Sequence, residues 1–330
     1  MRTILVRVMR IFIGVTIVLS ILLAILFVLF TQPSGTISTR MGTNKANAQR
    51  IQETVHFLTD GVPRNSDHPE SLEHIAGYIE SRFQATGADV KIQTYKARGK
   101  SFKNVIANYG PQNDSLIVIG AHYDVFGDLP GADDNASGTA VLLEVAEILS
   151  PEKLEFPIEF VSFCTEEPPF FGSEEMGSAI HAGSLKERGV KAECMICLEM
   201  VGYYTENQNW PNILLDLFYP SKGNFLAVIG RWEDRKLTRR VKSALKIEND
   251  LQVWSYNGPD LGGLDASDHR NYWLQDISAV MITDTAFIRN PNYHTPHDLP
   301  DTLDYKKMAI LSEGLIEVIS NLQIWINIHK

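Results

Sequence analysis

The longest run of apolar positions in the chain lies near the N-terminus. Ile11 to Phe30 reads IFIGVTIVLSILLAILFVLF, twenty residues without a charge. A helix of that length spans the ~30 Å hydrocarbon core of a bilayer, because each residue adds about 1.5 Å. A cleaved signal peptide would have a shorter apolar region of ~7–15 residues and a small-residue cleavage site, whereas TQPSG follows here. The pattern therefore favours a transmembrane signal anchor at residues 11–30 over a cleaved signal or a buried core helix.

Basic residues on the N-terminal side of this run set its expected orientation. Residues 1–10 contain three arginines and no acid. Positively charged flanks tend to stay in the cytoplasm. Membrane lipid is then a partner of the N-terminal helix. We expect a single-pass membrane protein with a cytoplasmic tail at 1–10, a linker at 31–44 and a domain at 45–330 on the periplasmic, extracellular or lumenal side.

Helical and strand-like patterns alternate along the rest of the chain. Apolar residues at helical spacing predict helices over 49–58, 70–86, 138–149 and 305–328. Apolar runs predict strands over 89–95, 104–108, 116–120, 156–164, 195–200, 225–229 and 278–283. This alternation is typical of an α/β fold, here a three-layer sandwich with a mixed, centrally parallel sheet. The first extended runs are expected to form an antiparallel edge.

Composition narrows the class of protein further. The chain has 44% hydrophobic and 21% charged residues, which is ordinary for a globular domain. Lys and Arg number 30 against 40 Asp and Glu, so the net charge of −10 makes nucleic acid an unfavourable partner. The three cysteines are too few for a disulfide scaffold. Cys194 and Cys197 are three apart on a predicted strand and face opposite sides, so packing explains them better than a redox pair.

Chemically active side chains follow the predicted strands. His122 and Asp124 come directly after LIVIG, and Asp134 lies in the loop GADDNASG that follows. Glu166 and Glu167 come after the strand FPIEFVSFC. Sites in such sheets form at the carboxyl ends of strands. Adjacent side chains on an extended segment point apart, so one carboxylate of the Glu pair can bind a metal while the other acts as a general base.

Two more candidates lie at later strand ends. Glu199 stands inside the apolar run CLEM, where a carboxylate is costly unless it is paired or coordinated. His294 follows the strand SAVMIT and precedes a tight turn that includes His297 and Asp298. Together with the earlier candidates they offer two imidazoles and several carboxylates, a suitable donor set for two zinc ions per chain.

Several sequence blocks of this chain resemble those of a known family. The blocks HYD, GADDNASG, TEE, FFGSEEMGS, LEMVGYY, SDH and YHTPHDLPDTLDY resemble those of the M28 family of co-catalytic zinc peptidases, in the same order over most of residues 50–330. By position, the resemblance implies one zinc bound by His122, Asp134 and Glu199. It implies a second zinc bound by Asp134, Glu167 and His294, with Asp134 bridging the two ions.

The resemblance also assigns the remaining roles. It implies that Glu166 is the general base and that Asp124 supports His122. Asp268 and His269, in the SDH block, are implied to contact the substrate or to support the site. Many aminopeptidases of the family carry Asp where this chain has Glu199. The activity implied is that of an exopeptidase acting on peptides at a free amino terminus.

Two alternatives remain open at this stage. Some relatives are glutaminyl cyclases, which use a similar scaffold with one zinc. Others are non-catalytic, membrane-anchored binding proteins that usually lose a ligand or the base. The pair Pro168–Pro169 follows the Glu pair where the family often has a short Gly/Leu stretch, and we expect it to shape the substrate entrance. The sequence makes no prediction of oligomeric state.

Overall fold

A single mixed sheet forms the centre of the domain. The structure is a computed structural model that describes residues 2–36, 45–149, 154–246, 251–260 and 262–329. Within these residues the strands are arranged in the order β1-β2-β4-β3-β5-β8-β6-β7. Their bounds are β1 Asp89–Ala97, β2 Lys100–Tyr109, β3 Ser115–His122, β4 Ile158–Phe163, β5 Lys191–Glu199, β6 Phe225–Gly230, β7 Gln252–Asn257 and β8 Ala279–Thr283.

The four central strands, β4, β3, β5 and β8, are parallel to one another. β1 and β2 add an antiparallel edge, as the sequence predicts, and β6 joins the other side antiparallel to β8. Every residue of β3 and β4 is buried, which explains the uninterrupted apolar run Leu116–Ala121 in β3 and the mainly apolar sequence of β4. Because the central strands are parallel, their carboxyl ends lie along one edge of the sheet.

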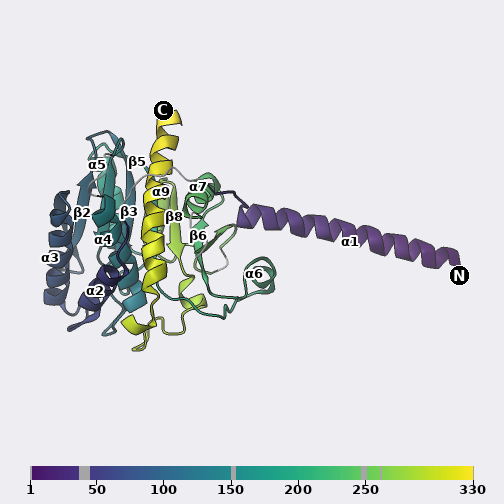
Figure 1. Cartoon of the computed structure of the whole chain (residues 1–330), viewed down its shortest axis with the longest axis horizontal. Helices are drawn as coiled ribbons and strands as arrows, with labels where there is room; N and C mark the ends of the chain where they lie inside the picture. The colour runs from purple at the N-terminus through teal and green to yellow at the C-terminus, as the bar shows by residue number, and fades with distance from the viewer. Residues whose placement is uncertain (1, 37–44, 150–153, 247–250, 261, 330) are drawn as a thin grey trace.

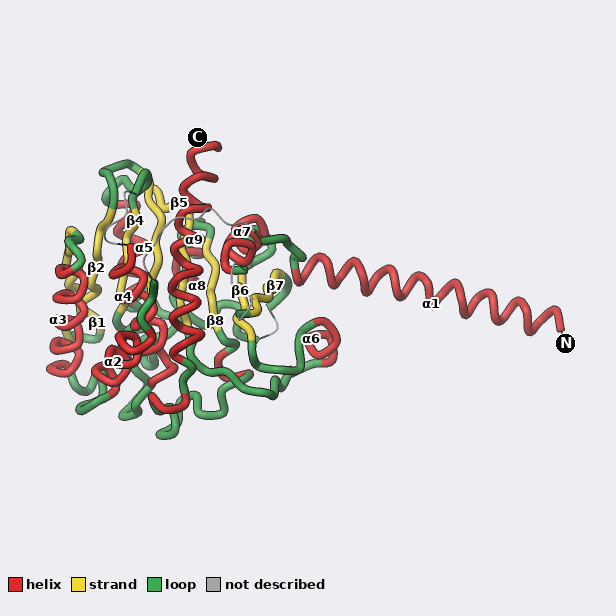
Figure 2. The backbone as a smooth tube through the Cα atoms, viewed as in Figure 1, coloured by secondary structure: helices red, strands yellow, loops and turns green. Residues whose placement is uncertain are grey.

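Helices cover both faces of the sheet (Figures 1 and 2). One apolar core packs α2, α3, α4, α7 and α9 against one face, and a second packs α5 and α8 against the other. Cys194 belongs to the first core and Cys197 to the second, so the two side chains face opposite layers. The three-layer α/β fold predicted from the sequence is therefore confirmed. The helix bounds are α2 Ala48–Thr59, α3 Pro69–Ala85, α4 Gly138–Leu149, α5 Gly177–Glu187, α6 Ile213–Phe218, α7 Arg235–Leu245, α8 His269–Trp273 and α9 Tyr305–His329.

The N-terminal helix α1 (Arg2–Thr31) projects away from the domain (Figure 1). Among the described residues, Ile4–Thr31 and Tyr305–Ile328 are long and apolar enough to cross a membrane. The second of these lies mostly buried in α9, as a core helix does, whereas the first has no buried part in its most apolar stretch. Residues 32–36 of the expected linker continue from α1, and its remaining residues lie outside the described part of the chain.

Candidate metal centre

The parallel strands bring distant parts of the sequence to one edge. His122 is the last residue of β3 and Glu199 the last of β5, and these two strands pair directly. Glu166 and Glu167 follow β4, which pairs with β3 on its other side. Asp134 lies in η1 (Ala132–Ser137), a short helical segment with a kink at this residue, immediately before α4. The fold therefore explains why predicted candidates far apart in sequence are neighbours.

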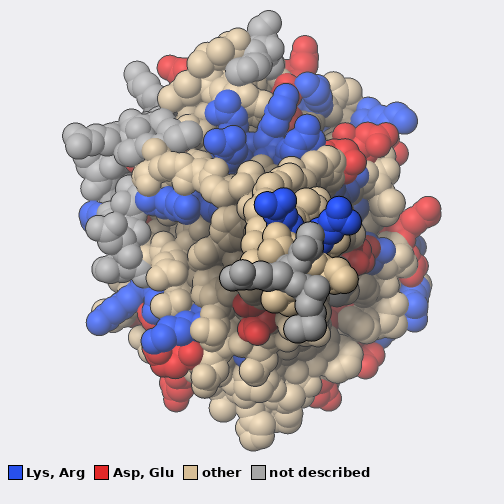
Figure 3. All heavy atoms as spheres, turned by 90° about the vertical axis from the view of Figure 1, so that its right-hand side faces the viewer, with Lys and Arg blue, Asp and Glu red and all other residues tan. Residues whose placement is uncertain are grey.

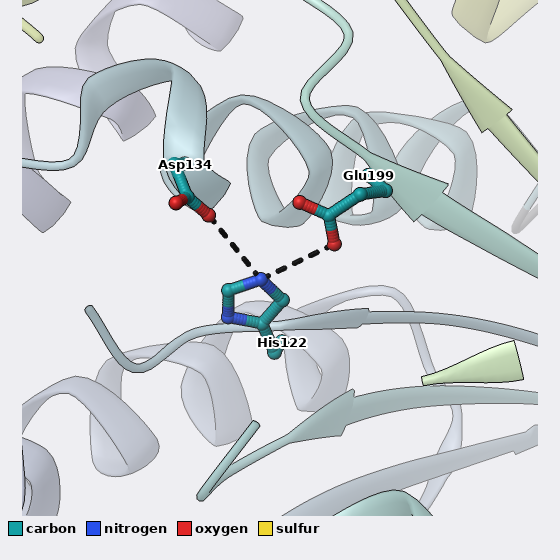
Figure 4. A group of neighbouring side chains, drawn as sticks. All are labelled: His122, Asp134 and Glu199. Carbon is teal, nitrogen blue, oxygen red and sulfur yellow. Dashed lines mark ion pairs between the residues drawn. The ribbon is translucent and has the colours of Figure 1, made fainter. Parts of the chain in front are cut away.

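The first group of possible ligands is His122, Asp134 and Glu199 (Figure 4). The Nε2 atom of His122 lies 3.5 Å from Oδ1 of Asp134 and 3.3 Å from Oε2 of Glu199. The donor atoms of the group all lie within 4.8 Å of one another, and all three residues are buried. The three side chains converge from a strand end, a loop and a second strand end, which leaves one point that each can reach.

The second group is Asp134, Glu167 and His294. The Nε2 atom of His294 lies 3.0 Å from Oδ2 of Asp134 and 3.3 Å from Oε2 of Glu167. Asp134 thus directs Oδ1 to the first group and Oδ2 to the second. The structure brings together all five residues that the sequence analysis names as ligands, and it places Asp134 where a bridging ligand would stand.

Glu166 faces the first group although it neighbours Glu167 in sequence. Its Oε2 atom lies 3.8 Å from Nε2 of His122, whereas Glu167 faces His294. The carboxylate of Asp124 holds the backbone of both residues, because it accepts hydrogen bonds from the N–H of Glu166 at 3.2 Å and of Glu167 at 3.0 Å. One carboxylate of the pair can therefore bind a metal while the other remains available for proton transfer.

Asp124 also orients His122. The Nδ1 atom of His122 lies 3.2 Å from the backbone oxygen of Asp124 and 3.6 Å from its Oδ1. An Nδ1–H donated in this direction leaves Nε2 as the unprotonated atom that faces Asp134 and Glu199. Asp124 therefore contacts both the imidazole of His122 and the backbone of the loop that carries Glu166 and Glu167.

Three residues support the site in a way that the sequence analysis does not predict. Asp298 accepts hydrogen bonds from the N–H groups of Asp133 at 2.9 Å and Asp134 at 3.1 Å. Ser267 donates its hydroxyl to Oε2 of Glu199 at 2.6 Å. Arg64 is fully buried and donates to the carbonyls of the loop just before Asp134. The blocks SDH and YHTPHD, which contain Ser267 and Asp298, were the available signal for these two residues, whereas no local pattern distinguishes Arg64.

Asp268 and His269 occupy different positions. Both carboxylate oxygens of Asp268 are buried and lack a hydrogen-bond partner within the described residues, and burial raises the pKa of this group to about 7. The ring of His269 lies with Nε2 2.8 Å from the carbonyl oxygen of Leu264 and packs edge-on against Trp273. His269 belongs to neither ligand group. The exposed prolines Pro168 and Pro169 directly follow Glu167, joined by a cis peptide bond.

The electrostatics of the site suit a cation. Burial alone would lower the pKa of His294, but the carboxylates of Asp134 and Glu167, at 3.0 and 3.3 Å from its Nε2, raise it to about 9. Burial raises the pKa of Glu166 well above its ordinary value, against the attraction of His122. Buried carboxylates at this density are costly unless positive charge compensates them.

The unpartnered atoms point to the same conclusion. Nε2 of His122, Nε2 of His294 and Oε1 of Glu167 are buried without a hydrogen-bond partner among the described residues. Buried polar atoms normally have partners, so these require one that the protein itself does not supply. Imidazole nitrogens and carboxylate oxygens in groups of three fit zinc. The residues present therefore fit a pair of metal ions.

An apolar cavity of about 110 Å³ adjoins the first group. Glu199 forms part of its wall. The remaining wall is mainly aromatic and aliphatic and includes Trp210, Leu215, Tyr219, Phe225 and Met281. Because this wall is mainly apolar, the cavity suits an apolar side chain placed beside the carboxylate of Glu199.

Comparisons with known proteins agree with this geometry. The model of peptidase family M28 matches residues 104–319. The uncharacterised protein YfbL of Escherichia coli is 46% identical over 289 residues, covering 84% of this chain and 88% of YfbL. Aminopeptidase YwaD of Bacillus subtilis is 31% identical over 126 residues, which is 37% of this chain and 26% of YwaD.

Solved structures share the fold at lower identity. LapB from Legionella pneumophila aligns with a TM-score of 0.67 at 22% identity, covering 84% of this chain and 72% of LapB. A glutaminyl cyclase from Bacteroides thetaiotaomicron aligns with a TM-score of 0.65 at 21% identity, covering 84% of this chain and 98% of the cyclase. At such identities the likeness concerns the fold alone. The family model, which matches more than half of the chain, and the extensive identity to YfbL lead to a plain conclusion: the chain belongs to peptidase family M28.

Proposed function

We propose that this chain is a membrane-anchored, zinc-dependent aminopeptidase that removes the N-terminal residue from peptides. The observation that carries the proposal is the pair of complete ligand groups sharing Asp134, with the carboxylate of Glu166 beside them. Family membership supports a peptidase, and relatives named as aminopeptidases support the exopeptidase class. The number of metal ions, the position of cleavage and the roles of individual residues belong to the proposal.

In the proposed reaction, water hydrolyses the first peptide bond of the substrate. Two zinc ions, held by His122, Asp134 and Glu199 and by Asp134, Glu167 and His294, would supply Lewis-acid polarisation of the carbonyl and a lowered pKa for the attacking water. Glu166 accepts a proton from that water as its oxygen bonds to the carbonyl carbon. When the C–N bond breaks, Glu166 returns the proton to the leaving nitrogen, so the carboxylate is regenerated.

The surroundings of Glu199 support a preference for an apolar first residue. The cavity beside it is lined mainly by aromatic and aliphatic side chains, which favour an apolar side chain over a charged one. The nearby buried carboxylates Glu199, Glu166 and Asp268 would attract the ammonium group of a free amino terminus. Leucyl and phenylalanyl amides should therefore be hydrolysed faster than aspartyl or lysyl amides.

Metal content and turnover test the proposal together. The full chain, purified in detergent without chelator, should contain about two zinc ions per chain and hydrolyse aminoacyl fluorogenic amides in a chelator-sensitive reaction. One zinc with release of pyroglutamyl product from an N-terminal glutamine would instead support the cyclase alternative. A folded chain with neither metal nor turnover would support the non-catalytic alternative.

We further propose that α1 anchors the domain in a membrane, with the domain on the extracytoplasmic side. The charge-free run Ile11–Phe30 and the arginines before it support this arrangement. Protease added to membrane vesicles should digest the domain only where the extracytoplasmic face is outward. Digestion confined to vesicles of the opposite orientation would contradict the proposed sidedness.

A further inference from the structure

The short helix α6 exposes apolar side chains on its outer face. Ile213, Leu214 and Leu217 have exposed fractions of 81%, 41% and 60%. These three residues lie on one side of the helix, because Leu217 is three positions from Leu214 and four from Ile213, and positions three and four apart are neighbours on a helix surface. Scattered apolar residues on a protein surface are ordinary, but several on one short helix mark a contact surface. The exposed side chains therefore require a partner outside the domain.

The inner face of α6 packs on the end of the N-terminal helix. The ring of Phe218 lies 5.8 Å from that of Phe27 and 6.5 Å from that of Phe30. Phe30 also contacts Tyr256 of β7, at 5.7 Å between ring centres. Leu215, Phe218 and Tyr219 form a small apolar core of their own with these residues of α1. Helix α6 is thus joined directly to the last turns of α1.

The position of this contact along α1 determines how deep α6 lies relative to the hydrocarbon core that α1 would cross. The charge-free run Ile11–Phe30 is about as long as a ~30 Å hydrocarbon core requires, so its last turn lies at the boundary of that core. That last turn is the one that meets Phe218. If α1 spans the bilayer, the exposed face of α6 lies at the same boundary.

Charge on the neighbouring helix fits a lipid surface. Arg235, Lys236 and Arg239 of α7 are exposed. Lys242 of the same helix donates to the backbone oxygen of Thr31 at 2.5 Å, which ties α7 to the end of α1. Figure 3 views the molecule along α1, and Lys and Arg side chains gather above the helix at the height of α7. Basic residues near the headgroups favour anionic lipid.

We propose that the surface formed by α6 and α7 docks on the same bilayer leaflet from which α1 emerges. Ile213, Leu214 and Leu217 then lie in the interfacial region, and the basic side chains of α7 contact anionic headgroups. Asp216 is exposed on the flank of α6 and faces neither the apolar side nor the core. The proposal rests on the anchoring role proposed for α1, and it does not depend on the chemistry of the site.

Docking would place substrate binding close to the lipid. Leu215 and Tyr219, on the inner side of the α6 segment, line the apolar cavity that adjoins Glu199. The same short segment therefore contacts the bilayer on one side and forms a wall of the cavity on the other. Peptides held at the membrane surface are the substrates that this arrangement favours.

Site-specific fluorescence tests the docking on the full chain in nanodiscs. The native cysteines Cys164, Cys194 and Cys197 are free and buried, so a polarity-sensitive dye will report an introduced cysteine. The dye is placed on Leu217→Cys in α6, with Val18→Cys in α1 as the control for the anchor. Ala85→Cys is the control for the surface, because α3 lies on the opposite side of the domain from α1 (Figure 1).

Spin-labelled lipids should quench the dye on the Leu217→Cys and Val18→Cys proteins, with blue-shifted emission, and should leave the Ala85→Cys protein unaffected. Quenching at Val18 without quenching at Leu217 would overturn the docking and leave the anchor standing. Absence of quenching at both positions would overturn the anchor as well. Chelator-sensitive hydrolysis measured on the same samples reports separately on the proposed peptidase activity.

The basic helix has its own test. Nanodiscs of phosphatidylcholine are compared with nanodiscs that also contain anionic phosphatidylglycerol. Quenching at Leu217 should be stronger with the anionic lipid, and a variant combining R235Q, K236Q and R239Q should lose that difference. If the dye at position 217 is quenched equally in both lipids while α7 is unsubstituted, the proposed role of α7 in docking is wrong.

Discussion

At the scale of single residues, the loop after β4 turns two adjacent glutamates toward different parts of the candidate site. Glu166 faces His122 and Glu167 faces His294, while Asp124 accepts a hydrogen bond from the N–H of each. These hydrogen bonds hold the backbone of two consecutive residues and so help to keep the two carboxylates pointed in different directions. The division between base and ligand in our proposal depends on this arrangement.

The role proposed for Glu166 predicts a loss of rate with the metal retained. Glu166→Gln keeps the size of the side chain but removes its ability to accept a proton, so kcat should fall on the order of 10²–10⁴-fold. Zinc content should stay as in the unsubstituted chain, since Glu166 is in neither ligand group. Glu174→Gln, an exposed glutamate in the following loop, is the matched control. Full activity of Glu166→Gln would contradict its assignment as the base.

The position of Asp124 predicts a different defect. Asp124→Asn weakens the support of His122 and of the Glu166–Glu167 backbone together, so zinc affinity should fall about 10–100-fold. Competition with a chelator of known affinity measures the change. Asp128→Asn serves as a control, because Asp128 is an exposed aspartate in the loop after the same strand. Zinc affinity equal to that of the control would show that Asp124 does not support the site.

At the scale of elements, a cluster of hydrogen-bonded polar side chains around the buried Glu159 joins α5 to the sheet. Glu159 of β4 is 3.1 Å from Nε2 of His181 in α5 and 2.7 Å from Nη1 of Arg188 at the end of that helix. Burial alone would raise the pKa of Glu159, but its hydrogen bonds with His181 and Arg188 lower it from 4.5 to about 2. None of these residues belongs to the ligand groups, so the cluster affects the packing of α5 on the sheet without involving the candidate metal centre.

The lowered pKa of Glu159 predicts acid sensitivity. A carboxylate whose pKa is lower in the folded state than in the unfolded state stabilises the folded protein at pH values above its unfolded pKa of 4.5. That contribution disappears as the pH falls toward the folded pKa of about 2. The shift corresponds to about 3 kcal/mol. The difference in the free energy of unfolding between the unsubstituted chain and Glu159→Gln should therefore shrink between pH 5 and pH 2.

Denaturant titrations of the full chain in detergent over this pH range measure the effect. Glu187→Gln, an exposed glutamate in α5, is the control and should leave the pH profile of stability unchanged. A constant difference between the Glu159→Gln protein and the unsubstituted chain would contradict the prediction.

Element prediction succeeded where the apolar period was clean. The predicted helices at 49–58, 70–86, 138–149 and 305–328 correspond to α2, α3, α4 and α9. Four shorter helices, α5 to α8, and the strand β7 were not predicted. Helix α7 reads RKLTRRVKSAL and buries Leu237, Val241 and Leu245, which recur at helical spacing, so its period was present in the sequence and was overlooked. In the edge strand β7, Tyr256 and Trp254 face α1 and α6, which lie outside the sheet.

At the scale of the whole molecule, metal binding and folding should be linked. The two ligand groups join three strand ends, the loop before α4 and the loop after β8. Zinc bound only by the folded chain adds about 1.4 kcal/mol of stability per tenfold rise in free zinc above its dissociation constant, for each site. The unfolding midpoint of the full chain should rise with zinc and fall with a chelator.

Asp134→Asn is the decisive variant for this linkage. Because Asp134 belongs to both groups, this variant should lose most of the response to zinc. Magnesium should produce little stabilisation of either protein, since imidazole-containing groups suit zinc better than magnesium. A midpoint that responds equally to zinc in both proteins would contradict the shared role of Asp134.

The sequence by itself determined the α/β class, the apolar N-terminal helix and the list of possible ligands. The spacing of apolar residues in a segment reflects which of its faces is buried, and this spacing can be read from each segment without knowledge of the others. The ligand list came from residue types placed after buried strands, such as His122 and Glu199, and from the family resemblance that those blocks carry.

The tertiary structure alone decided which of these residues meet. Strand order is set by pairing between distant segments, so the neighbourhood of β3 and β5, and with it that of His122 and Glu199, has no local signal. The same holds for Asp298, which binds the backbone of Asp134 across a long sequence separation. It holds as well for the contact of Phe218 with the end of α1, on which the proposed docking to the bilayer rests.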